Sequence, residues 1–288
     1  PAEFKALGKI DIGTVENQTT KEVVFNIPNL SDRGMKTISY KLVNENSEVA
    51  ITEFTMTNNF SVAVEAKAEV VIDGIISEGE WTANNKLSAA APSNYIPHPN
   101  KKSDYYDPAP CETPEDKSAN AMVMWDDKYL YMCTEVTDDV YFQNETVENS
   151  WKTDDIQFGV YADIGEVDFF AIGATNTNFH EYTIALSADG SKVEVYKSRT
   201  QDDRTQVGMV DVEAKARRNG KITTYEWAIP WAEMVGIEGW HPTEGQILKF
   251  SMLWNENDGG GRKGWIEFAS GIGLTKDNRL FTTLMLVK

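Results

Sequence analysis

One stretch predicts the fold: Trp151-Lys152-Thr153-Asp154-Asp155-Ile156-Gln157-Phe158-Gly159-Val160-Tyr161-Ala162. From residue 155 onward, polar and apolar side chains alternate. The apolar residues 156, 158 and 160 fall on one face of an extended chain, and Asp155 and Gln157 fall on the other. This stretch therefore predicts a strand with one face in a core and one face that presents polar groups.

The same two-residue period recurs on both sides of this stretch, and no segment keeps a helical period for three turns. We expect one helical turn, at 230–235, and otherwise an all-β chain. The other strands are expected at 120–126, 128–136, 167–174, 180–186, 192–197, 208–217, 221–229, 246–255, 264–269 and 280–287. Residues 92–118 carry six prolines and are expected to form a large surface loop.

The first 66 residues show shorter alternating segments separated by turn-like clusters. Their spacing is typical of a small sandwich, and an immunoglobulin-like domain fits best. The expected strands are 21–27, 37–43, 49–56 and 60–66. Because this region has no His, Cys or Trp, we expect it to act as a spacer. We therefore predict two domains, an immunoglobulin-like β-sandwich over 1–66 and a larger antiparallel β-sandwich over 67–288.

The composition favours a folded, acidic, extracellular protein. Of the 288 residues, 41% are hydrophobic and eight are Trp, which is ample material for a core. The formal charge of −18 disfavours nucleic acid and anionic membrane surfaces as partners and favours neutral ligands or divalent cations. No apolar run is long enough to cross a membrane. The chain starts at Pro1 without Met, as expected for a fragment of a longer secreted protein.

Several segments, in order, resemble family 9 carbohydrate-binding modules, the sugar-binding domains of xylanases and other polysaccharide-degrading enzymes. The resemblance covers residues 67–288. It is carried by Val71-Ile72-Asp73-Gly74, Glu80-Trp81, Met124-Trp125-Asp126-Asp127-Lys128-Tyr129-Leu130-Tyr131, Glu135-Val136-Thr137-Asp138, Trp151 to Phe158, Tyr225-Glu226-Trp227-Ala228-Ile229-Pro230-Trp231, Leu248-Lys249-Phe250 and Trp254-Asn255-Glu256-Asn257-Asp258.

The resemblance implies a non-catalytic module that binds oligosaccharides or chain ends from xylan or cellulose, covalently linked to a catalytic domain. A sugar site needs a flat aromatic ring beside amide and carboxylate groups. Trp151 follows a polar run and is expected to be exposed, whereas Trp81, Trp125, Trp227 and Trp231 are expected in the core. The predicted sugar-binding residues are Trp151, Asp154, Gln157, Trp254, Asn255, Asn257 and Arg262.

The sequence departs from the family at the second half of its aromatic clamp. Xylanase-type members hold a sugar between two Trp side chains, the second in the loop before the last strand. Here that loop, 270–278, has no aromatic residue. Gln157 stands where those modules have a Glu, and Leu253 where they have a Gln. Other aromatic platforms are Trp254, Trp265, Tyr95, Tyr105 and Tyr106, and Arg262 is placed to reach hydroxyls or a uronic acid carboxylate.

A structural calcium ion is expected, because Ca²⁺ takes oxygen ligands from acidic loops and the family carries calcium in or near these segments. The expected ligands are Asp73, Glu78, Glu80 and Asp138, together with Asp139 next to it. Zinc is disfavoured, because the two Cys and three His show no ligand spacing. Cys111 and Cys133 allow one disulfide, and whether they pair is left open.

Three other functions are weighed. An enzyme is disfavoured, because no Gly-x-Ser-x-Gly elbow occurs and abundant carboxylates carry no information about glycoside hydrolysis. A haem-binding electron-transfer domain of the same sandwich type would need His180 with Met252 or Met209. A spacer without ligand is the third reading, favoured by the missing second Trp.

Overall fold

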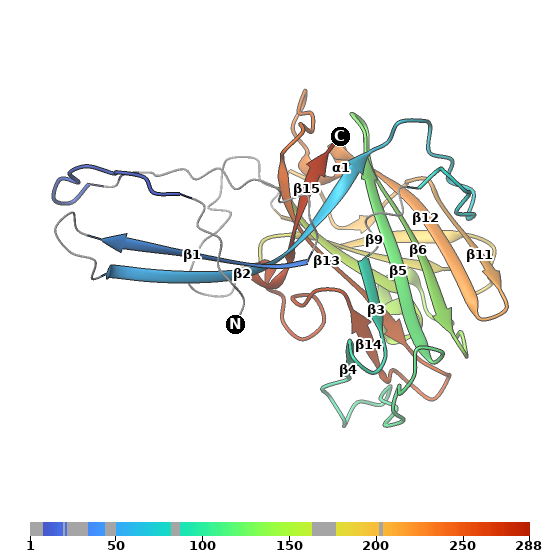
Figure 1. Cartoon of the computed structure of the whole chain (residues 1–288). Helices are drawn as coiled ribbons and strands as arrows, with labels where there is room; N and C mark the ends of the chain where they lie inside the picture. Colours follow the sequence, from blue (N-terminus) through green and yellow to red (C-terminus); the bar gives the residue numbers. More distant parts are fainter. Residues whose placement is uncertain are drawn as a thin grey trace.

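Strands β1 to β15 form a single sheet in the described part of the chain, which comprises residues 8–19, 21, 34–43, 50–81, 87–162, 177–201 and 204–288 of a computed structural model. The hydrogen-bonded order is β10-β9-β8-β7-β13-β15-β2-β5-β6-β12-β11. Off this path, β1 pairs with β2, β3 with β5, and β14 with β13 and β4. The sheet curls, and its β9 and β11 regions approach each other (Figure 1).

The strands are β1 (Gly34–Val43), β2 (Ala50–Glu65), β3 (Leu87–Ala90), β4 (Tyr95–Pro97), β5 (Lys117–Trp125), β6 (Tyr129–Asp138), β7 (Ile156–Ala162), β8 (His180–Leu186), β9 (Val193–Arg199), β10 (Gly208–Met209), β11 (Ala214–Asn219), β12 (Ile222–Pro230), β13 (Ile247–Glu256), β14 (Gly264–Glu267) and β15 (Thr282–Val287). The helical elements are η2 (Val147–Lys152), α1 (Trp231–Val235) and η3 (Asn278–Leu280). No helix in the described part of the chain has the length and apolar character needed to cross a bilayer.

The predominantly β fold is confirmed, but the sheet is mixed rather than wholly antiparallel. β15 pairs in parallel with β2, from Thr283 opposite Phe60 to Val287 opposite Val64, and the end of β2 pairs in parallel with β5. Alternation predicts that a segment is a strand, but it does not encode which strand lies beside it or in which direction. The predicted strand 208–217 is split into β10 and β11, and 167–174 lies outside the described residues.

Among the first 66 residues, those that the structure describes do not show an immunoglobulin-like domain. Residues 50–56 and 60–65 of the predicted strands belong to one continuous strand, β2, and 37–43 lies within β1. These two strands form a ribbon that extends from the rest of the sheet (Figure 1), and the last residues of β2 belong to the larger sheet. The predicted strand 21–27 lies largely outside the described residues. The domain boundary after residue 66 stays a prediction.

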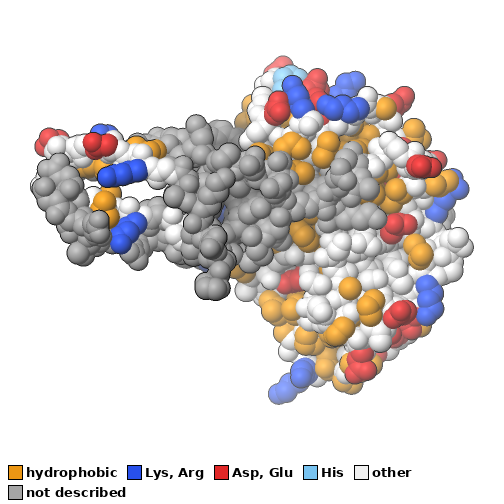
Figure 2. All heavy atoms as spheres, viewed as in Figure 1, with side chains coloured by type: hydrophobic (Ala, Val, Ile, Leu, Met, Phe, Trp, Pro, Cys, Tyr) orange, Lys and Arg blue, Asp and Glu red, His pale blue; other side chains and the backbone are white. Residues whose placement is uncertain are grey.

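The main core lies between the inner faces of the curled sheet. It contains the even-numbered residues of β7 together with Trp125, Trp227 and Trp254. Burial of Trp81, Trp125, Trp227 and Trp231 is confirmed, with at most 5% of each residue exposed. On the surface drawn in Figure 2, acidic and basic side chains are interspersed among apolar ones.

Two smaller clusters cover the outer faces of the sheet. Segment 67–81 covers β5, β6 and β12, where Trp81 packs against the sheet and donates from Nε1 to Glu226 at 2.8 Å. On the other side, Trp265, Ile272 and Phe281 cover part of β7 and β13. Both faces of β7 are therefore buried along its length.

Gly159 supplies a test of this packing, because a Cβ there would lie 2.5 Å from the Phe281 ring. We expect Gly159→Ala to lower the free energy of unfolding by about 1–3 kcal/mol, the usual cost of overpacking. Phe281→Leu should restore much of that loss in the double variant, relative to the single variants, as measured by urea denaturation. Additive effects of the two substitutions would contradict this contact.

Candidate functional site

A row of polar side chains lies on the outer face of β7 and β13. Gln157 and Asp155 are held by Asn255, whose Nδ2 donates to Asp155 Oδ1 at 2.5 Å and to Gln157 Oε1 at 3.3 Å. Ser150 Oγ donates to the other carboxylate oxygen of Asp155 at 2.9 Å. Burial raises the pKa of Asp155 to about 6. The three side chains are thus fixed in orientation by one another.

Arg262 closes one end of this row. Its Nε donates to Asn255 Oδ1 at 2.9 Å, and Nη2 donates to the same oxygen. The guanidinium carbon lies 4.7 Å from the centre of the Trp265 ring and 5.5 Å from that of Trp151. Burial lowers the pKa of Arg262 to about 10, which leaves it charged at neutral pH. The Arg262 guanidinium is therefore a fixed cation between the polar row and the rings of Trp151 and Trp265.

Trp151 stands at the edge of the row, in the short helix η2. It is half-buried, whereas the polar run before it predicted an exposed ring. Its ring meets Tyr105 at a centroid distance of 5.3 Å and an interplanar angle of 88°. Lys152 Nζ lies 5.6 Å from the Trp151 ring centre. The structure thus brings Trp151, Gln157, Asn255 and Arg262 together, as predicted from the sequence.

Glu181 on β8 extends the row and was missed by sequence reasoning. Gln157 Nε2 donates to Glu181 Oε1 at 3.5 Å, and Lys276 Nζ donates to the same oxygen at 2.6 Å. Arg199 lies 3.7 Å from its other oxygen. The sequence gives little indication that Glu181 belongs to this row, because it lies next to His180 in an ordinary alternating strand.

Three predicted residues lie elsewhere. Trp254 is fully buried in the main core, because it neighbours Asn255 in β13 and so points to the opposite face. Asn257 shapes the following loop, where its side chain accepts from Gly259 N at 2.7 Å and donates to the Lys152 carbonyl at 2.7 Å. Asp154 points away from Asp155, toward Lys117.

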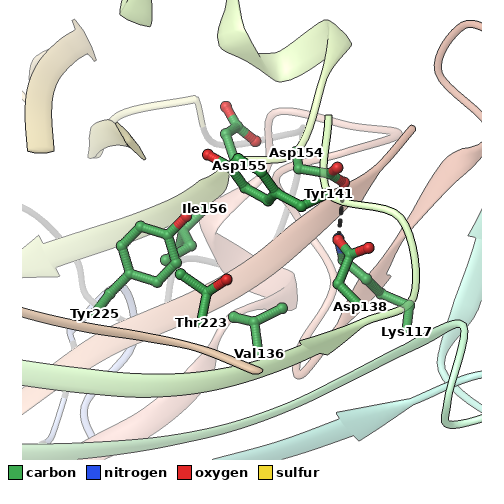
Figure 3. A pocket seen from close by; sticks show the side chains of 9 residues that line it. All are labelled: Lys117, Val136, Asp138, Tyr141, Asp154, Asp155, Ile156, Thr223 and Tyr225. Carbon is green, nitrogen blue, oxygen red and sulfur yellow. Dashed lines mark hydrogen bonds and ion pairs between the residues drawn. The ribbon is translucent and has the colours of Figure 1, made fainter. Parts of the chain in front are cut away.

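Lys117 is the centre of a buried ionic cluster. Its Nζ lies 2.5 Å from Asp138 Oδ2, 2.8 Å from Asp154 Oδ1 and 3.2 Å from Glu256 Oε2. In Figure 3, Lys117 lies beside Asp138 and contacts Asp154 directly, and all three residues line a small cavity. Burial opposes the charge of Lys117, but the three carboxylates raise its pKa well above the usual value. The cavity, about 10 Å³, has room for roughly one water molecule and none for a sugar.

The predicted calcium ligands do not gather into one site. Glu80 accepts from Val71 N at 2.8 Å and Ser77 N at 3.3 Å, and Asp73 accepts from Ile75 N at 2.8 Å, so both shape the 67–81 segment. Glu78 is exposed on the same segment. In the described residues, three or more carboxylates converge in two overlapping groups: Asp138, Asp154 and Glu256, and Asp139, Glu256 and Asp258. Of the predicted ligands, Asp138 belongs to the first group and Asp139 to the second.

Comparisons with known proteins agree with this architecture. A family model described as "Carbohydrate family 9 binding domain-like" matches residues 97–288. Two similar solved structures are family 9 carbohydrate-binding modules from Caldicellulosiruptor kristjanssonii, one in complex with cellotriose and one in complex with glucose. The first has a TM-score of 0.54 at 16% identity over 79% of this chain and 93% of that chain. The second has a TM-score of 0.50 at 17% identity over 77% and 94%. No curated protein sequence matches.

The opposite placements of Trp151 and Trp254 make a matched pair of substitutions. Trp254→Ala should cost about 3–5 kcal/mol of unfolding free energy, because it empties a packed core. Trp151→Ala should leave the melting temperature nearly unchanged, because its ring lies at the surface edge of the polar row. Thermal denaturation of both variants tests this, and a loss of several kcal/mol in Trp151→Ala would place that ring in the core instead.

Proposed function

The chain belongs to the carbohydrate family 9 binding domain-like family, whose members are non-catalytic binding modules, and on this premise we propose that it binds oligosaccharides or chain ends derived from cellulose or xylan. We further propose that it serves a secreted, multidomain polysaccharide-degrading protein. The cellotriose and glucose in the two similar structures support a glucan-type ligand.

One observation carries this proposal: a half-buried Trp lies beside a preorganised row of amide, carboxylate and guanidinium groups. A pyranose ring has an apolar C–H face and a rim of hydroxyls, so it needs a flat aromatic surface and hydrogen-bonding groups at its edge. Trp151 supplies the surface. Gln157 and Arg262 supply the hydrogen-bonding groups. Asn255, whose amide is used within the row, fixes their orientations, which lowers the entropy cost of binding.

The placement of the tryptophans favours small soluble ligands over crystalline cellulose. All eight lie in the described residues, and six of them are buried. The other two are Trp151 and Trp240, and Trp240 packs on Trp231 at a centroid distance of 5.5 Å. A crystalline surface needs a row of exposed rings, whereas one ring suits a site for one or two sugars. Such a site should give a Kd of roughly micromolar to millimolar.

Calorimetry against cellotriose, xylotriose and glucose tests the proposal. We expect weak, enthalpy-driven binding to at least one of them and its loss in Trp151→Ala. Trp240→Ala is the matched control and should bind as the wild type does. Strong adsorption to microcrystalline cellulose that millimolar glucose or cellotriose does not inhibit would contradict a small recessed site.

The haem-binding alternative has no supporting observation. His180 Nδ1 accepts from the Gln201 backbone N–H at 3.2 Å, and Met252 is fully buried in the main core. Met209, at the β10 edge, is 60% exposed. An iron ligand set would therefore require repacking of the core, and an absorption spectrum of the purified protein tests this reading directly.

We also propose that calcium binds at Asp139, Glu256 and Asp258, a set that shares Asp139 with the ligands expected from the sequence. Asp139 Oδ1 and Asp258 Oδ1 are buried without a hydrogen-bond partner, and the two Glu256 carboxylate oxygens lie 3.2 Å from the Lys117 ammonium and 3.5 Å from that of Lys263. With Asp138 and Asp154, these residues bring five carboxylates together around two ammonium groups, those of Lys117 and Lys263. Oxygen ligands from two loops with surplus negative charge fit a hard divalent cation.

Chelation should therefore lower the melting temperature, because a metal that binds the native state alone stabilises it by about 2.7 kcal/mol at a hundredfold excess over its Kd. Asp258→Asn should weaken this calcium effect in differential scanning calorimetry. Glu78→Gln is the matched control and should preserve it. Identical melting curves with chelator and with excess calcium would overturn the proposal.

A further inference from the structure

Two loops are joined backbone to backbone beside Trp151. Arg262 N donates to the Tyr105 carbonyl at 2.5 Å, and Asp107 N donates to the Arg262 carbonyl at 3.2 Å. At the base of the same loop, His98 N donates to the Lys263 carbonyl at 2.8 Å. These bonds fix the loop of residues 98–107 against the loop that carries the buried guanidinium.

Gly261 makes this close approach possible. It has a φ of +123°, and a Cβ at this position would lie 2.7 Å from the Tyr105 carbonyl oxygen. A larger residue would push the two loops apart. The Gly259-Gly260-Gly261-Arg262 stretch therefore places Tyr105 and Arg262 together next to Trp151.

The Tyr105 ring is held by a side-chain contact as well as by the backbone hydrogen bonds of its loop. His98 contacts it edge to face at 5.6 Å between ring centres and an interplanar angle of 89°. Tyr105 and Trp151 are both half-buried and stand at 88° to each other. Two perpendicular, half-buried rings form a corner, in contrast to the parallel walls of a clamp.

Lys152 lies beside both walls of this corner. Its Nζ is 5.9 Å from the Tyr105 ring centre and 5.6 Å from the Trp151 ring centre. Its pairing with Glu145 is loose, at 3.8 Å, and the side chain is 25% exposed. Because this ion pair is long, little attraction holds the Lys152 ammonium in place, and it can move aside when an uncharged ring enters.

We propose that Tyr105 is the second aromatic wall of the sugar site and that the Tyr105–Trp151 corner takes a single pyranose ring. This inference rests on the proposed function. The sugar stacks its apolar face on one ring and turns an edge C–H toward the other, while its hydroxyls meet Arg262 and the polar row. Tyr105 thus substitutes for the aromatic residue that loop 270–278 lacks. It comes from loop 98–107, on the other side of the site.

Calorimetric titration of the full chain with cellotriose tests the corner. Tyr105→Ala should weaken binding about tenfold, the effect of losing one favourable aromatic contact. Tyr105→Phe keeps the ring and should bind within about threefold of the wild type. Tyr106→Ala is the matched control, because Tyr106 contacts His98 but no contact joins its ring to Trp151; it should also stay within about threefold.

The outcomes separate this inference from the function on which it rests. Wild-type affinity in a folded Tyr105→Ala variant, with Trp151→Ala still inactive, would overturn the corner and leave the sugar site standing. No binding of any tested sugar by the wild type would overturn the proposed function itself. Melting temperatures of all variants, and the Trp fluorescence change on adding cellotriose, show whether Trp151 keeps its position when Tyr105 is replaced.

Discussion

The register between β7 and β13 determines both the core and the candidate site. Ile156 lies opposite Trp254 and Gln157 opposite Leu253, so the even-numbered residues of both strands enter the main core together. The odd-numbered residues then face outward together, which places Asp155, Gln157 and Asn255 within hydrogen-bond reach of one another. A shift by one residue would exchange the two faces of β7, turning the amides into the main core and the core side chains toward the polar row, so the core and the polar row depend on the same register.

The buried Lys117 cluster connects this sheet to the two loops that carry Trp151 and Arg262. Its partners come from the end of β6, from the residue two before β7, and from the end of β13. Asp154 also accepts from Phe142 N at 2.6 Å and from Asn257 N at 3.2 Å, so one carboxylate holds both neighbouring loops. A buried charge is costly without partners, and the arrangement of these loops is therefore tied to the ionic cluster rather than to contacts at the surface.

Alternation in the sequence predicted most strands and the burial of Trp125 and Trp227. The resemblance placed Trp151, Gln157, Asn255 and Arg262 in one site, and the structure brings these four residues close together, although their role in binding stays a prediction. Alternation also contained information that the sequence analysis did not use: Trp254 and Asn255 are adjacent in one strand and so cannot share a face. Glu181 and Lys117 were missed because their roles depend on partners that are distant in the chain. The parallel neighbours of β2 were missed for the same reason, since a period of two says nothing about strand order.

The long strand β2 has a mechanical consequence. Its first part pairs with β1 in the extended ribbon, and its last part runs in parallel with β15 up to Val287. Tension between the ribbon and the C-terminal residue would act along these parallel strands in opposite directions. It would load their backbone hydrogen bonds in shear, all at once, instead of opening them one after another.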